Sequence, residues 1–396
     1  MNEKLSRREG RYMRRQETRK QKLIARNMKV GTIEDIFTYS NMYKHGKKCC
    51  NGVRWKASTQ NFERHLFSGT ASRRCKILNN SWRADAYNHF TLHERGKIRP
   101  IDAPRIHDRQ VHKVFTANVL LPLYTPGMIY NNGASLPGKG FDFSRRMLVR
   151  DLRRHYREFG TDGNIILLDF KQFFPSVPHN ELYARHERLI LDDRLRKFAD
   201  DIVGSNGCSI GLPLGVEPSQ AEMIAFPSGL DNYIKSQLSI KCAGHYMDDY
   251  YAIIPPGVDA KEILAKIISK AESIGLTVSR AKTKIIPLSR PFKYCKLKYT
   301  LTSTGKVVVN GCRGSVKRAR RKFKKFYDMV NSGEMSYLDL WASVNGVIAY
   351  FEKYNDHNRV LKLRRLFFAL FGFSCEDFST FRTMNKQHNE LKGRNR

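Results

Sequence analysis

The sequence predicts a mixed α+β body followed by an all-helical C-terminal domain. Short apolar or aromatic runs typical of strands alternate with helical patterns between residues 164 and 310. From about residue 314 the pattern is helical to the end, strongly basic at first and apolar later. Because the first region interleaves strands with helices and the second contains only helical patterns, the order favours an α+β body followed by a separate helical domain.

The individual segments follow this outline in order. Residues 1 to 29 carry eleven Lys or Arg against three acids, which is typical of a solvated tail or of an arm that orders on nucleic acid. Residues 164 to 170 form an apolar run that ends in an acid, as expected of a buried strand emerging at a sheet edge. Further helices are expected at 180–204, 219–238 and 260–274, and further strands at 283–288, 294–302 and 306–310.

The charge of the chain points to a phosphate-rich partner. Its 396 residues include 71 Lys or Arg against 37 Asp or Glu, a formal net charge of +34. Such an excess repels itself in a compact protein, and phosphate backbones are its usual partner. A ribosomal-type binding protein and a membrane-surface protein are the alternatives that charge alone leaves open.

Other features of the sequence predict a cytoplasmic protein without a membrane partner. The basic N-terminus lacks an apolar signal core, and no run approaches the roughly 20 apolar residues of a membrane span. The eight cysteines include no CxxC pair and no Cys/His spacing typical of zinc, so they are interpreted as thiols in a reducing compartment.

Three acids have the setting that nucleotidyl transfer requires. That chemistry uses two divalent ions about 3.5–4 Å apart, one at the attacking 3′-hydroxyl and one on the triphosphate. Mg²⁺ prefers carboxylate oxygens, with Mn²⁺ as a substitute. Asp169 ends one predicted strand, and Asp248 and Asp249 lie at the tip of a predicted hairpin between two β-prone runs. An isolated Asp-Asp pair would be an ordinary exposed turn, but the second strand-terminal acid favours a metal site if the strands are neighbours.

The motifs around these acids resemble those of reverse transcriptases. Tyr246-Met247-Asp248-Asp249 matches the Tyr-x-Asp-Asp box, and Asp169 to Phe174 resembles the family's first metal-binding motif. The next motifs of the family follow in the same order. Their counterparts here are Gly211 to Gly215 followed by Ser219-Gln220, then Gly275-Leu276 with Lys282-Thr283, then 292–300, and each is a resemblance. Upstream, 96–101 and 133–140 resemble the fingers segment and the loop before the first metal motif. The series covers roughly residues 90 to 310.

This resemblance implies a right-hand polymerase with fingers, palm and thumb. The implied division is a basic N-terminal extension (1–45), fingers (46–160), palm (161–312, interleaved with fingers elements) and a helical thumb with C-terminal tail (313–396). Asp169, Asp248 and Asp249 would be the catalytic residues and would bind the metal ions together with the carbonyl of Phe170.

The resemblance also implies a nucleotide site. Lys97 and Arg99 would hold the triphosphate, Gly215 would lie at the nucleotide, and Lys282 would assist the leaving pyrophosphate. Phe174 occupies the position of a steric gate that excludes the ribose 2′-hydroxyl and so selects deoxynucleotides. The alternatives are a solvated surface for the cations and a core role for Phe174. One departure is Leu214, where many members carry a Gln that can hydrogen-bond the nucleotide or template.

The basic segments predict contacts with nucleic acid. Residues 317–325 carry seven positive charges in nine, and on a helix these are expected to point nearly all round. The predicted nucleic-acid contacts are Arg14, Arg15, Lys317, Arg318, Arg320, Arg321 and Lys322.

The compact, basic chain is most similar to bacterial defence-associated reverse transcriptases, which are related to group II intron and retron enzymes. This similarity implies an RNA-directed DNA polymerase that uses dNTPs, copies a dedicated structured non-coding RNA into cDNA and acts against phage. Alternatives are a retron-type or domesticated group II intron-type enzyme, an RNA-dependent RNA polymerase, and a non-catalytic RNA-binding protein. The sequence is also compatible with a homo-oligomer.

Overall fold

The computed structural model describes residues 7–94, 96–354 and 356–394, which form two compact units. Unit 1 comprises residues up to 148, 166–252 and 259–285; unit 2 comprises 149–165, 253–258 and the chain from 286. In the described residues no helix is long and apolar enough to cross a membrane. The division into extension, fingers, palm and thumb stays a prediction.

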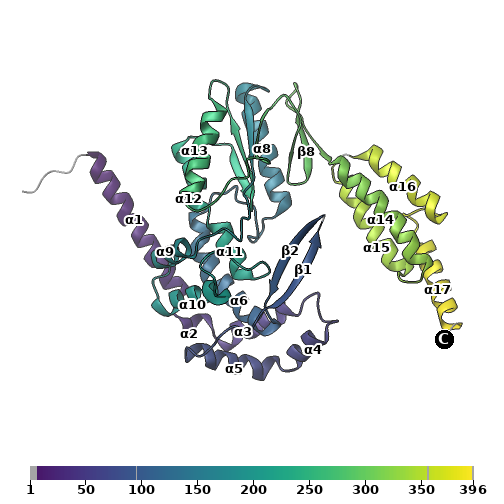
Figure 1. Cartoon of the computed structure of the whole chain (residues 1–396), viewed down its shortest axis with the longest axis horizontal. Coiled ribbons are helices and arrows are strands. Elements are labelled where there is room, and N and C mark those ends of the chain that lie inside the picture. The colour runs from purple at the N-terminus through teal and green to yellow at the C-terminus, as the bar shows by residue number, and fades with distance from the viewer. Residues whose placement is uncertain (1–6, 95, 355, 395–396) are drawn as a thin grey trace, which may run out of the picture. The chain divides into compact units, whose positions relative to one another are not determined.

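The first half of the chain is mostly helical and is interrupted by one β-ribbon and one further strand (Figure 1). Its elements are α1 (Arg7–Val30), α2 (Ile33–Ile36), α3 (Tyr39–Cys49), α4 (Ala57–Arg64), α5 (Leu66–Leu78), β1 (Asn88–Glu94), β2 (Lys97–Ala103), α6 (Ile106–Phe115), the π-helical η1 (Thr116–Leu120), α7 (Leu121–Tyr124), η2 (Thr125–Gly127), α8 (Phe141–Phe159), β3 (Asn164–Leu168), α9 (His179–Leu189) and α10 (Asp193–Val203).

The second half carries the remaining strands and then a run of helices. Its elements are η3 (Gly204–Asn206), α11 (Glu217–Ala225), α12 (Ser228–Asn232), the π-helical η4 (Tyr233–Gln237), β4 (Ala243–Tyr246), β5 (Asp249–Ile254), α13 (Ala260–Glu272), β6 (Lys284–Pro287), β7 (Phe292–Tyr294), β8 (Leu297–Leu301), β9 (Val307–Gly311), α14 (Arg313–Asn331), α15 (Tyr337–Glu352), α16 (His357–Phe371) and α17 (Phe378–Arg394).

Two of the expected helices are divided. The helix expected over 180–204 is α9 and α10, and Asp192 caps the start of α10 by accepting from the Leu195 amide. The helix expected over 219–238 breaks between α11 and α12, where Pro227 precedes the first residue of α12. The strand expected over 294–302 is also divided, because a turn at Cys295 and Lys296 separates β7 from β8.

The central sheet has the strand order β4-β5-β3-β6. β4 and β5 are antiparallel, with Tyr246 opposite Asp249. Ile165, Ile166 and Leu168 of β3 are buried, so the apolar run that predicted this strand forms part of the core. The sheet therefore provides the rigid base on which the acidic residues are placed.

Helices α9, α10 and α11 share a buried ionic network in unit 1. The His186 ring contacts Asp200 Oδ1 at 2.6 Å through Nδ1 and Glu222 Oε1 at 3.1 Å through Nε2. The Tyr124 hydroxyl donates to the same Glu222 oxygen at 2.7 Å. Burial alone would lower the pKa of His186, but the carboxylates of Glu222 and Asp200 outweigh it and raise the pKa to about 9. The imidazolium thus ties these helices together.

We expect this network to make the protein less stable in alkali. Because the folded pKa of His186 lies above the unfolded value of about 6.5, its contribution is complete below pH 6.5 and is lost as pH rises through about 9. The difference corresponds to roughly 3 kcal/mol at most. Thermal unfolding of wild type and His186→Gln between pH 6 and about 10 should show the wild-type advantage shrinking with pH. Parallel profiles for the two proteins would contradict this assignment.

Unit 2 contains the β7-β8-β9 sheet and the C-terminal helices. Asp356, just before α16, accepts from the Gly311 amide at 2.6 Å and pairs with Arg359 at 3.0 Å. This buried carboxylate fixes the end of β9 to the start of α16. The core of the C-terminal helices is aromatic and aliphatic, formed chiefly by Phe323, Phe326, Leu340, Val344, Phe351, Leu363, Phe367 and Phe381.

Candidate active site

The acidic pair lies at a two-residue hairpin turn, as the sequence predicts. Tyr246 pairs with Asp249 across β4 and β5, which leaves Met247 and Asp248 as the turn residues. Met247 has a φ of 53°, a left-handed conformation that tight hairpin turns require and that a non-glycine residue adopts only under constraint. Asp248 therefore projects from the tip, and Asp249 begins β5.

The end of β3 lies beside this hairpin. Strand β3 neighbours β5 in the sheet. The ring of Phe170 meets the ring of Tyr250 edge to face, with 5.4 Å between centroids. Since Asp169 directly precedes Phe170 and Asp249 directly precedes Tyr250, this contact brings the two acidic ends together. Asp169, Asp248 and Asp249 are all partly exposed.

The backbone of Phe170 is oriented by the strand segment around Val278. Lys171 donates to Thr277 O and Ser279 donates to Asp169 O, each at 2.8 Å, on either side of the Phe170–Val278 bridge. Because backbone groups of successive residues point to opposite edges of a strand, the carbonyl of Phe170 faces away from Val278. This orientation is compatible with the predicted role of that carbonyl as a metal ligand.

Lys282 lies against the first carboxylate. Its Nζ is 2.5 Å from Asp169 Oδ1, and the Asp169 side chain is 18% exposed. The carboxylate of Asp169 is thus paired with the ammonium group of Lys282. Three carboxylates and one backbone carbonyl are the hard oxygen donors that Mg²⁺ prefers, so the donor set fits that ion.

Sequence reasoning missed a buried pair behind the hairpin. His245 Nδ1 donates to the carbonyl of Met247 at 3.0 Å, and Nε2 contacts Asp231 Oδ2 at 3.1 Å. The His245 and Asp231 side chains are 0% and 1% exposed. The His245 ring also stacks on Tyr250 at 4.3 Å. His245 therefore holds the turn that presents Asp248, and Asp231 orients His245. The only sequence signal was a histidine directly before the Tyr-x-Asp-Asp box.

We expect His245→Ala to lower kcat by about 10- to 100-fold, the range for partners that orient metal ligands. The reason is that the left-handed turn at Met247 loses its hydrogen bond, so Asp248 is no longer held in one position. Primer extension at increasing Mg²⁺ should show a raised Mg²⁺ requirement as well. Asp231→Asn, which retains an acceptor oxygen, is the matched variant and should have a smaller effect. A folded His245→Ala protein with wild-type kcat and Mg²⁺ dependence would contradict the positioning role.

Phe174 and Phe173 have different environments. Phe173 is 6% exposed and stacks on Phe170 at 5.5 Å, whereas Phe174 is only half-buried. The carbonyl of Phe174 accepts from the Leu212 amide at 3.0 Å, which places it beside the 211–215 loop. Phe173 is thus the core aromatic of the pair, and the surface position of Phe174 is compatible with the predicted steric gate.

The 211–215 loop packs on strand β2. The Asp102 amide donates to Leu214 O at 2.8 Å. Gly215 has a φ of +113°, and a Cβ there would lie 3.1 Å from Asp102 O and 3.2 Å from Ile101 Cγ2. Only glycine fits this close approach without strain. On the same β2 strand Arg99 is exposed, whereas the side chain of Lys97 lies outside the described residues. The roles of Lys97, Arg99 and Gly215 stay predictions.

Helix α14 differs from the expectation in the distribution of its charges. The charges of α14 do not point all round, because Ala319, Phe323, Phe326 and Val330 form a buried stripe. Spacings of four, three and four residues place these side chains on one face of the helix. The remaining face is exposed and carries Lys317, Arg318, Arg320, Arg321, Lys322, Lys324 and Lys325.

Helix α1 is largely exposed, and none of its residues is fully buried. Arg14 and Arg15 are exposed on it. Near its C-terminal end, the Asn27 side chain donates to Leu189 O at 3.0 Å and accepts from the Leu191 amide at 3.0 Å. This helix is therefore anchored at one end and solvated along the rest, and the nucleic-acid role of both arginines stays a prediction.

Comparison with known proteins decides the family. The model of the reverse transcriptase (RNA-dependent DNA polymerase) family matches residues 88–298, more than half of the chain. The chain belongs to the reverse transcriptase family. This reverse transcriptase is accordingly an RNA-directed DNA polymerase, a nucleotidyltransferase. The expected α+β fold of the right-hand polymerase class is confirmed.

Other comparisons are more distant. No curated protein matches the sequence. Among solved structures, apo telomerase from Candida tropicalis truncated from its C-terminal domain is 13% identical, with a TM-score of 0.44 over 61% of this chain and 60% of its own. Telomerase from Candida albicans in complex with a fragment of telomeric RNA is 14% identical, with a TM-score of 0.46 over 81% and 62%. The reverse transcriptase thus spans about 60% of the length of these chains.

Membership of this family favours an RNA-directed DNA polymerase over two of the alternatives, the RNA-dependent RNA polymerase and the non-catalytic RNA-binding protein.

Proposed function

We propose that this reverse transcriptase copies a dedicated structured non-coding RNA into DNA by two-metal nucleotidyl transfer. The observation that carries the proposal is the position of Asp169 beside the turn that bears Asp248 and Asp249, supported by the Phe170–Tyr250 contact. These carboxylates and the carbonyl of Phe170 would hold two Mg²⁺ ions, with Mn²⁺ as a substitute. When bound, the ions supply Lewis-acid charge at the 3′-hydroxyl and the triphosphate.

The chain's own residues would then bind and orient the dNTP. Lys97 and Arg99 on β2 provide positive charge for the triphosphate. Gly215 lets its own loop, residues 211–215, approach β2 closely. Phe174 would limit the space at C2′ of the sugar. Lys282, which pairs with Asp169, would offset negative charge around the reacting phosphates.

The proposed template is a structured RNA. The exposed face of α14 and the solvated length of α1 carry cations that can neutralise phosphates. Because A-form RNA is bound mainly through its backbone and shape, such faces suit a folded RNA better than a base-specific site. The resemblance to defence-associated reverse transcriptases supports a role against phage in the cytoplasm. A retron-type or domesticated group II intron-type enzyme is the alternative.

Sequencing the RNA and DNA that co-purify with wild type and with Asp248→Ala tests this proposal. One RNA enriched in both, with complementary DNA only in wild type, is the expected result. Phage plating on cells that express either protein tests the biological role, and protection should require Asp248. Heterogeneous RNA without Asp248-dependent DNA would overturn the dedicated template, and equal protection by both proteins would overturn a catalytic defence role.

A further inference from the structure

Three side chains able to bind a metal ion meet at the base of the β1–β2 ribbon (Figure 1). The antiparallel register of this ribbon ends at the pair of Asn88 and Ala103. Asp85 comes just before that pair along the chain, and His107 and Asp108 come just after it. The two segments that leave the ribbon thus bring an acid from one side together with a histidine and an acid from the other.

The spacing of the three ligand atoms suits one small ion. His107 Nε2 lies 3.0 Å from Asp85 Oδ2 and 3.6 Å from Asp108 Oδ2. One ligand atom from each residue lies within 4.8 Å of the other two. In four-coordinate zinc sites, bonds of about 2.0–2.2 Å place neighbouring ligand atoms roughly 3.3–3.6 Å apart. The separations from His107 lie on either side of this range, so small side-chain rotations suffice to bind one ion.

The chain itself compensates the buried carboxylate of Asp108 only in part. This side chain is 2% exposed and accepts from the Asp85 amide at 3.1 Å. Both carboxylates face the same nitrogen of His107, and at 3.6 Å the Asp108 oxygen lies beyond hydrogen-bond distance from it. Burial raises the pKa of Asp108, although the charge of His107 acts in the opposite direction. A divalent cation among the three side chains would neutralise both acids.

The donor atoms indicate which ion fits. Imidazole is a common ligand of Zn²⁺, whereas Mg²⁺ prefers oxygen donors. Three protein ligands leave a fourth position of the Zn²⁺ ion for water. We propose that Asp85, His107 and Asp108 bind one Zn²⁺ ion that closes the base of the β1–β2 ribbon. This site shares no residue with the catalytic carboxylates, and the inference is independent of the proposed function.

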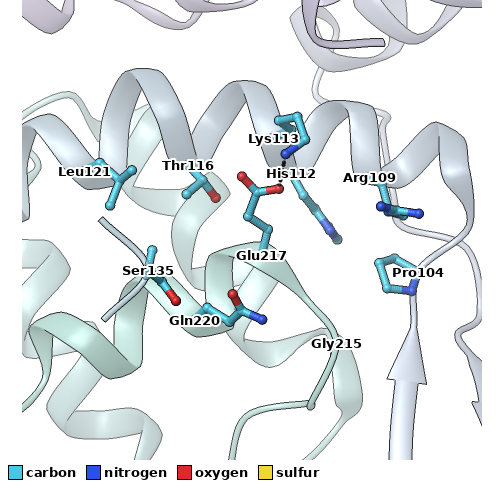
Figure 2. Close-up of a pocket in the computed structure, with 11 residues that line it drawn as sticks. Pro104, Arg109, His112, Lys113, Thr116, Leu121, Ser135, Gly215, Glu217 and Gln220 are labelled. Atoms are coloured by element: carbon cyan, nitrogen blue, oxygen red, sulfur yellow. Dashed lines mark hydrogen bonds and ion pairs between the residues drawn. The ribbon is translucent and has the colours of Figure 1, made fainter. Parts of the chain in front are cut away.

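A bound ion would join the segment before β1 to the first turn of α6. Figure 2 shows the other connection at this place, where Pro104 follows the end of β2 and Arg109 lies on the helix that comes next. Because Arg99 lies on β2, a closed base would also limit the movement of this predicted triphosphate contact.

Titration of the untagged full-length protein with Zn²⁺ against a competing chelator tests the site. Excess Mg²⁺ is present, so that sites made only of oxygen donors are filled. Wild type should bind one Zn²⁺ per chain. Asp85→Asn and His107→Ala change side chains that are 45% and 32% exposed, so the fold should be retained. Each should weaken Zn²⁺ binding by more than about 100-fold, the upper limit for partners that only orient metal ligands.

His89→Ala is the matched control, because His89 pairs with a single carboxylate, Asp102, at 2.7 Å on the same ribbon. It should bind Zn²⁺ as wild type does. Arg105 pairs with Asp85 at 3.3 Å and so competes with the ion, and its side chain is 54% exposed. Arg105→Ala should therefore bind Zn²⁺ at least as tightly as wild type.

The melting temperature provides a second measurement. An ion that binds only the folded protein raises it, so Zn²⁺ should stabilise wild type and His89→Ala but not Asp85→Asn. Absence of a stoichiometric Zn²⁺ site in wild type would overturn the proposal and leave an ion pair between His107 and Asp85. Equal affinity and equal stabilisation in wild type, Asp85→Asn and His107→Ala would place the ion elsewhere and overturn the proposal as well.

Discussion

Replacing Asp248 by asparagine is expected to lower Mg²⁺-dependent DNA synthesis by about 10²- to 10³-fold, the range for one preorganised electrostatic contact in an active site. Asparagine keeps the size and one oxygen of the side chain but removes its charge. The left-handed turn at Met247, held by His245, would still present residue 248 at the hairpin tip. The lost activity would therefore reflect lost charge at the metal site and not a displaced backbone.

Single-turnover extension of a primed RNA template measures this effect. Asp193→Asn is the matched control, because that side chain is 84% exposed and pairs with Arg196 within its own helix. Such surface pairs contribute roughly 0–1 kcal/mol, so activity and stability should stay near wild type. Retention of more than about a tenth of wild-type activity by a folded Asp248→Asn protein would remove Asp248 from the metal site.

The local parts of this site could be predicted from the sequence. The apolar run before Asp169 and the β-prone flanks of Asp248 and Asp249 are short-range patterns, and they gave the strand end and the hairpin tip. The amphipathic character of α14 was also present in the spacing of Ala319 and Phe323, but the density of positive charge obscured it.

Features that depend on contacts between distant segments could not be predicted. Asp231 and His245 are fourteen positions apart and pair because the fold brings α12 against β4. The cavity that His112 lines depends in the same way on α6 facing α11 across more than a hundred residues of chain (Figure 2). No periodicity or propensity encodes such pairings, because tertiary packing decides them.

Replacing Phe174 by alanine is expected to let the enzyme incorporate ribonucleotides. The backbone of Phe174 lies beside the 211–215 loop and its ring is half-buried, whereas its neighbour Phe173 fills the core. Removing the Phe174 ring should therefore open space at the sugar without collapsing the fold. Discrimination by one group in a fitted pocket amounts to about 1–3 kcal/mol, so the preference for dNTPs over rNTPs should fall about 10- to 200-fold.

The ratio of kcat/KM for dCTP and CTP on one template checks this expectation. Phe174→Tyr keeps the bulk of the ring and should keep the wild-type ratio, whereas Phe173→Ala should destabilise the protein by about 3–5 kcal/mol without admitting CTP. If Phe174→Ala discriminates as strongly as wild type, the gate lies elsewhere on the nucleotide site. If wild type already uses CTP well, sugar selection is not a property of this site. A selective gain in Phe174→Ala alone would assign the choice of DNA as product to the half-buried ring of Phe174.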